Sequence, residues 1–150
     1  MSNKNEIVVK SNRLVEASYR LDLAEQRIIL FSIVEARKTG KGLNATDFVT
    51  IRAVDYAEHF GIPAKQAYEQ IKQAAKTLFK RYVILHDTYS KSGVARTTEV
   101  RWLSAASYID GEGTIQLQFS GLMVPYITRL EAEFTRYRLE KIANMTSAYA

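Results

Sequence analysis

Hydrophobic residues recur at intervals of three and four along residues 64–79, the period of a helix with one buried face. This apolar stripe consists of Ala67, Tyr68, Ile71, Ala74, Ala75, Leu78 and Phe79. Just before it, Gly61 and Pro63 interrupt the pattern with a permissive residue and a rigid one. Residues 55–79 therefore predict a short helix, a tight turn and a longer helix, the outline of a helix-turn-helix.

Two runs rich in β-branched and aromatic residues follow, at Tyr82–Thr88 and Ala95–Leu103. They flank Ser90–Gly93, a short polar stretch that ends in glycine, so the three segments together predict a β-hairpin. A helix-turn-helix that continues directly into a hairpin is a winged helix, with the hairpin as its wing. The expected fold class is therefore α+β: a winged helix whose wing lies on a small antiparallel sheet, with additional packing helices.

A further helix is predicted over Gln26–Lys38. Asp22 and Glu25 precede it with the spacing of a capping box, in which each side chain accepts a hydrogen bond from the other residue's amide. Its middle, Ile28–Val34, is apolar on nearly every side. Such a helix must be covered, either as a central core helix, which is the simpler interpretation, or by a partner chain.

Alternating apolar and polar residues predict strands at Phe48–Ala53 and Thr114–Ser120. Trp102, Leu103 and Tyr108 are expected to pack behind the second of these strands. Residues 122–130 predict a short helix that Pro125 interrupts early.

The polar face of the longer predicted helix carries Lys65, Gln66, Glu69, Gln70, Lys72, Gln73 and Lys76. Gln can bond two edge atoms of adenine and Lys can reach guanine or phosphate, so this face fits a DNA major groove. Glu69 has the wrong charge for DNA, and an ordinary solvated face is the competing interpretation. Lys91 and Arg96, near the tip of the predicted wing, are candidates for contact with the DNA backbone or minor groove, although charged hairpin tips also serve solubility.

Composition and charge agree with a nucleic-acid partner. The 150 residues are 47% hydrophobic, enough for a single domain over residues 1–150 with a core of its own. Lys and Arg outnumber Asp and Glu by 21 to 16, and the net charge of +5 favours a polyanion. The sequence has no cysteine, no apolar signal-peptide core and no apolar run of membrane-spanning length, so we expect a cytoplasmic protein without contact with a membrane.

Catalytic chemistry finds no support in the sequence. The two histidines, His59 and His86, are far apart and lack neighbouring ligands, which argues against a metal-dependent nickase. Thr39–Gly42 resembles part of a phosphate-binding loop, but its first glycine and its Ser or Thr are missing. We therefore expect no enzyme, no catalytic residue, no metal and no cofactor.

Three segments resemble the N-terminal winged-helix domain of iteron-binding plasmid replication initiators, the Rep proteins. They are the opening Val9–Arg27, whose most specific part is Glu25-Gln26-Arg27, the helix-turn-helix at 55–79, and the closing residues Phe134–Tyr137 with Ser147–Ala150. The resemblance covers essentially the whole chain.

This resemblance implies two tandem winged helices that bind repeated origin sites, of which this chain holds the first, so that the second domain is absent. It also implies a dimeric form that represses the protein's own gene, and partners among host replication proteins or chaperones. Lys65, Gln66, Gln70, Gln73 and the wing residues 91–96 fall on candidate DNA-contacting positions by this resemblance.

The rival interpretation is a protein-interaction module that binds DNA weakly or not at all. Apolar surface at Tyr149 or on Ile28–Val34 would then be covered by a second copy. On either interpretation we expect a homodimer when the chain is isolated.

Overall fold

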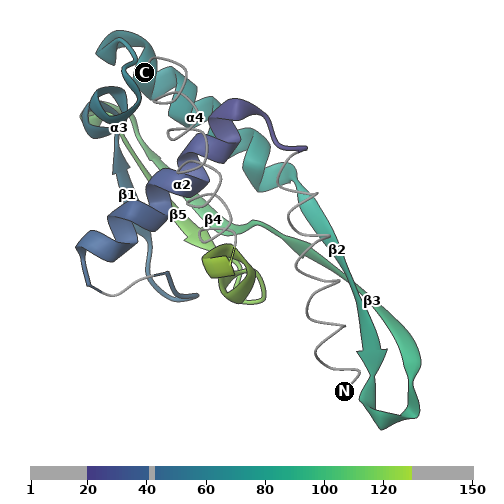
Figure 1. Ribbon diagram of the computed structural model, residues 1–150. Helices are drawn as coiled ribbons and strands as arrows, with labels where there is room; N and C mark the ends of the chain where they lie inside the picture. Colours follow the sequence, from purple (N-terminus) through teal and green to yellow (C-terminus); the bar gives the residue numbers. More distant parts are fainter. Residues whose placement is uncertain (1–19, 41–42, 130–150) are drawn as a thin grey trace, which may run out of the picture.

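A computed structural model describes residues 20–40 and 43–129 (Figure 1). Its elements are α2 (Leu23–Lys38), β1 (Val49–Arg52), α3 (Ala53–Phe60), α4 (Ala64–Lys80), β2 (Tyr82–Tyr89), η1 (Ser90–Ser92), β3 (Val94–Arg101), β4 (Leu103–Ile109), η2 (Asp110–Glu112) and β5 (Thr114–Phe119). Residues 124–129 add a last helical segment. The expectations for residues 1–19 and 130–150, including Tyr149 and the closing segments of the resemblance, lie outside the described residues.

The strands form two separate sheets. An antiparallel sheet has the order β1-β5-β4, and β2 pairs with β3 alone. The β2–β3 hairpin extends away from the rest of the molecule, directly after the end of α4 (Figure 1). The predicted helix-turn-helix and wing are therefore confirmed, with α3 beginning at Ala53, two residues before the predicted start.

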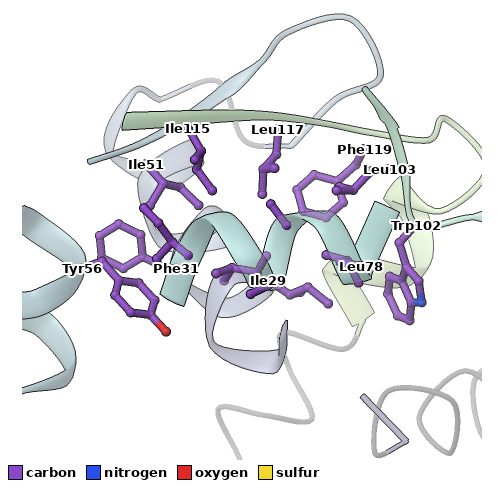
Figure 2. Packing of buried hydrophobic residues seen from close by; sticks show 14 of the residues in the cluster. Ile29, Phe31, Ile51, Tyr56, Leu78, Trp102, Leu103, Ile115, Leu117 and Phe119 are labelled. Carbon is purple, nitrogen blue, oxygen red and sulfur yellow. The ribbon is translucent and has the colours of Figure 1, made fainter. Parts of the chain in front are cut away.

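The core lies between the three-stranded sheet and the helices. Ile51, Ile115 and Leu117 of the sheet are fully buried and point toward α4 and α2, as Figure 2 shows. Phe31 of α2 meets Tyr56 of α3 edge to face, with ring centroids 5.9 Å apart. The predicted core helix is thus confirmed, and the alternative that Ile28–Val34 offers apolar surface to a second copy is wrong, because Ile28, Ile29, Phe31 and Ile33 are at most 5% exposed.

The turn of the helix-turn-helix depends on its glycine. Gly61 ends α3 with φ +66°, a left-handed conformation that other residues adopt only with strain. The Ile62 amide then donates to the Ala57 carbonyl at 2.9 Å, and α4 begins immediately after Pro63. Tyr56 is fully buried as predicted, whereas Phe60 and Ile62 are only partly buried.

One buried carboxylate ties the start of α2 to the end of α4. The predicted capping box is present, with the Glu25 amide donating to Asp22 at 2.8 Å and the Asp22 amide donating to Glu25 at 2.9 Å. Glu25 is completely buried, and its second oxygen accepts from Arg81 Nε at 2.6 Å and from the Thr77 hydroxyl at 3.0 Å. Since Arg81 directly precedes the wing, this network fixes the point from which the wing leaves the body.

Two expectations are corrected. Leu103 and Tyr108 do not pack behind the sheet but belong to one of its strands, β4, which the sequence pattern missed because its centre is Ser104-Ala-Ala-Ser107. Trp102, which is 1% exposed, marks the point where the chain leaves the wing and enters this sheet. Pro125 does not interrupt its helix either: it is the second residue of the helical segment 124–129, where the missing amide hydrogen costs nothing.

Candidate nucleic-acid interface

The outer face of α4 is exposed because its apolar stripe is turned toward the core. Ala67, Ile71 and Leu78 are fully buried, which leaves the opposite side of the helix in solvent. The exposed polar residues of α4 are Lys65, Gln66, Glu69, Gln73, Lys76 and Lys80, and these six residues are called the outer face. Within the described part of the chain, none of these six side chains makes a hydrogen bond or an ion pair. Four of the predicted contact residues, Lys65, Gln66, Gln73 and Lys76, are therefore brought together on one open surface.

Gln70 and Lys72, the other two predicted contact residues on α4, are partly exposed and are each bonded to another element of the fold. The Tyr56 hydroxyl donates to Gln70 Oε1 at 2.8 Å, which ties α3 to α4. Lys72 donates to Asp110 Oδ1 at 2.9 Å and so ties α4 to the turn between β4 and β5. The sequence analysis gave Gln70 and Lys72 the same role as the four predicted residues that lie on the outer face. Sequence spacing does not show which flank of a helix meets a neighbouring element.

Asp110 organises a polar cluster beside α4. It accepts from the Tyr68 hydroxyl at 2.5 Å as well as from Lys72. Desolvation, followed by this hydrogen bond, raises the pKa of Tyr68 to about 12. The two donated hydrogen bonds lower the pKa of Asp110, and the hydrogen bond to Asp110 raises the pKa of Lys72. The cluster stays an ion pair with a neutral tyrosine near neutral pH, so the charge of Lys72 is largely offset within the chain.

Lys76 belongs to the outer face but also touches this cluster. Its ammonium group lies 5.5 Å from the centre of the Tyr108 ring, a cation–π distance. Burial raises the pKa of Tyr108, so its ring remains neutral. The contact positions the lysine without neutralising its charge.

Of the two predicted wing residues, Lys91 and Arg96, one is left in solvent and the other is paired within the fold, as on α4. Lys91 is exposed in the turn η1, and Gly93 closes this turn with φ +77°. Arg96 is not at the tip: it lies in β3 opposite Asp87 of β2 and forms a two-pronged ion pair with it. That hydrogen bonding raises the pKa of Arg96. Lys91 makes no hydrogen bond or ion pair with any residue that the structure describes, whereas Arg96 joins the two strands of the hairpin through Asp87.

Two cations near the wing were missed by the sequence reasoning. Lys80 is exposed in the last turn of α4 and follows Lys76 by four residues, so the helical period would have found it. Arg101 donates to the Phe79 carbonyl at 2.9 Å and lies 5.9 Å from the Phe79 ring, which caps the end of α4. No sequence signal indicated that contact, because it joins α4 to the far strand of the hairpin.

His59 and His86 are both exposed, as expected for ordinary surface residues. Residues 20–40 and 43–129 contain no group of three side chains placed to hold a metal ion. The same residues include no helix that is both long and apolar enough to cross a bilayer.

Comparison with known proteins finds a matching family model, a curated relative and solved structures. The family model described as the WH1 domain of initiator replication proteins matches residues 7–150. The crystal structure of the MSBI1.176 WH1 domain, a replication protein isolated from a multiple sclerosis patient, is 40% identical and has a TM-score of 0.79 over 86% of this chain and 97% of that chain. An uncharacterized 27.6 kDa protein of Escherichia coli is 25% identical over 95% of this chain, which spans 62% of that relative's length.

A more distant structure shares the fold alone. The Pi initiator protein in complex with iteron DNA is 21% identical, with a TM-score of 0.61 over 77% of this chain and 47% of that chain. The WH1 domain and the Pi initiator share with this chain the mixed arrangement of helices and a small antiparallel sheet, which confirms the predicted fold class.

Proposed function

Because the chain belongs to the WH1 family of initiator replication proteins, we propose that it binds the repeated sequences of a plasmid origin through the outer face of α4 and the wing tip at Lys91. The single observation that supports this most is the set of unpaired polar side chains on α4. Lysines and amides left in solvent on the second helix of a helix-turn-helix are the groups that bond base edges and phosphates.

The distribution of charge supports the same proposal. The outer face carries three lysines and one carboxylate, so the helix presents an excess of positive charge where it would enter a groove. The Pi initiator, which has the same fold, was solved with iteron DNA. Repeated origin sites are therefore the duplexes that we propose for this chain.

The test is selection of the purified protein against a random duplex library at two salt concentrations, followed by sequencing. Enrichment of a motif supports base reading by this domain. Retention that falls steeply with salt but enriches no motif reduces the proposal to binding of the backbone. No retention at either salt contradicts it.

A second candidate function is self-association through the wing. Tyr82, Tyr89 and Val94 of the hairpin are each about 60% exposed, and Ile84 is 41% exposed. Apolar side chains on a hairpin that projects from the body favour coverage by another surface. We propose a homodimer joined at this hairpin, a form in which the protein would repress its own gene.

Light scattering of the wild type and of the double variant Tyr89→Ser/Val94→Ser distinguishes a monomer from a homodimer joined at the wing. A mass of two chains that falls to one in the variant supports self-association at the wing. A mass of one chain for the wild type across micromolar concentrations contradicts it.

The activity of a whole initiator is a wider proposal. The chain spans 62% of the length of the curated relative that it matches. We propose that it acts beside a second winged helix and that contacts with host replication proteins or chaperones belong to the complete protein. Residues 1–150 form a single domain in this proposal.

A further inference from the structure

Glu69 lies in the middle of the outer face of α4. It is the only acidic residue among the 17 residues of this helix. Lys65 and Gln66 precede it by about one turn, and Gln73 follows it by about one turn, so cations and amides surround it on the exposed side. On a surface that binds a polyanion, a carboxylate at this place opposes the long-range attraction.

The carboxylate of Glu69 is not bonded within the described part of the fold, although its charge contributes to the raised pKa of Lys72 and of Tyr68. Glu69 forms no hydrogen bond and no ion pair with any described residue, although lysines stand four positions before it and three after it. Lys72, the closer of the two in sequence, donates to Asp110 instead. The usual explanation for a glutamate on a lysine-rich helix, an ion pair within the helix, therefore does not apply here.

The chemistry of a duplex limits what a carboxylate can contact. An ionised carboxylate only accepts hydrogen bonds, and phosphate oxygens are acceptors too, so the two repel each other. In the major groove the only donors on base edges are the exocyclic amino groups, N4 of cytosine and N6 of adenine. Guanine offers only acceptors there, and thymine offers an acceptor and a methyl group.

We infer that Glu69 is a specificity-determining residue whose carboxylate accepts a hydrogen bond from the exocyclic amino group of one base in the major groove. This inference rests on the proposed function and deepens it. The lysines of the outer face contribute affinity that does not depend on the base sequence. Glu69 disfavours guanine and thymine at one position of the site. The net charge of the face remains positive, so this rejection does not prevent binding.

The test compares three variants in the duplex selection. Glu69→Ala removes the acceptor and is expected to lower the preference at one position of the selected motif by roughly 5- to 150-fold. Glu69→Gln keeps an acceptor and adds a donor, which suits adenine. If the wild type reads cytosine, this variant is expected to change the preferred base to adenine; if the wild type reads adenine, the preference is retained.

Glu112→Ala is the matched control. Glu112 is an exposed carboxylate in η2, beside the Asp110 cluster, so its removal changes the net charge equally without touching α4. We expect it to raise affinity for all duplexes alike and to leave the motif unchanged.

Two results overturn the inference, and they differ in what else they affect. If the wild type enriches a motif and Glu69→Ala enriches the same motif with the same preference at every position, Glu69 is only a solvated charge and the proposed function stands. If the wild type enriches no motif, base reading by this domain fails together with the role of Glu69. Melting curves of both Glu69 variants establish that they are folded.

Discussion

The polar side chains of α2 and those of α4 are used in different ways. Near the start of α2, Glu25 bonds Arg81 and Thr77, Gln26 donates to the Leu21 carbonyl at 2.9 Å, and Arg27 lies 5.3 Å from the Phe60 ring. On the outer face of α4 the side chains make no hydrogen bond or ion pair with any described residue, and Lys76 only lies over the Tyr108 ring. Polar groups that are already paired hold the scaffold, and those left unpaired are available to a ligand.

This difference also explains which residues carry the family resemblance. Glu25-Gln26-Arg27 is the most specific part of the opening segment, yet its contacts are all directed into the fold. The side chains of this motif hold α2 against α3 and against the end of α4, from which the wing extends. The DNA-binding surface that we propose lies elsewhere, on α4, whose residues gave only a loose sequence pattern.

The largest effect is expected from Glu25→Ala. This change removes a fully buried carboxylate and leaves Arg81 Nε without its acceptor, whereas the Thr77 hydroxyl keeps the Ala74 carbonyl at 3.1 Å as an alternative acceptor. Arg81 is 41% exposed, so water can solvate its guanidinium once Glu25 is gone, and the free energy of unfolding should fall by about 1.5–3 kcal/mol in urea denaturation. A loss below about 1 kcal/mol would mean that the network does not hold α2 to α4.

Glu69→Ala provides the contrast for that experiment. It removes the same chemical group from an exposed position where it has no hydrogen bond or ion pair with a described residue, and surface changes of this kind alter stability by less than about 0.5 kcal/mol. Equal losses for the two variants would contradict the distinction between paired and unpaired carboxylates.

The wing offers a smaller comparison, between Lys91 and Arg96. Lys91→Gln should lower the slope of log affinity against log salt by about 0.9, which is the loss of one phosphate contact. Arg96→Gln should leave that slope unchanged, because Asp87 already holds the guanidinium. Affinities measured by fluorescence anisotropy over a series of salt concentrations give the slope for both variants. A slope that falls in Arg96→Gln but not in Lys91→Gln would contradict the proposed contact at Lys91.

The smallest effect concerns the pH dependence of the Asp110 cluster. The lowered pKa of Asp110 contributes stability that is complete above its ordinary value of 3.8 and is lost as pH falls through the lowered value. The raised pKa of Tyr68 contributes stability that is complete below 10.0 and is lost as pH rises through about 12. Both contributions are therefore present at neutral pH.

NMR titration of labelled tyrosine checks the second statement, with Tyr68→Phe used to assign the signal. In Asp110→Asn the pKa of Tyr68 should move from about 12 toward 10.0, because the carboxylate that accepts a hydrogen bond from its hydroxyl is gone. An unchanged titration would show that desolvation alone sets the value.

The sequence predicted the elements better than it predicted their contacts. Periodicity found α2, α4 and the wing, because burying one face of an element leaves a period in the sequence. It missed β4, since Ser and Ala at the centre of that strand carry little β signal. It also placed Gln70, Lys72 and Arg96 with the open residues, because their partners Tyr56, Asp110 and Asp87 come from other elements or from the opposite strand.

The central claim is that DNA is bound by the unpaired residues of α4, and the salt dependence of binding tests it most directly. The measurement compares a Lys65→Gln/Lys76→Gln/Lys80→Gln variant with Lys72→Gln, using one duplex over a range of salt concentrations. The account predicts that the triple variant loses affinity for this duplex and that the slope of log affinity against log salt falls by as much as about 0.9 for each lysine that contacts phosphate. Lys72→Gln is expected to stay near the wild type. An unchanged slope in the triple variant, or an equal fall in Lys72→Gln, would contradict the claim.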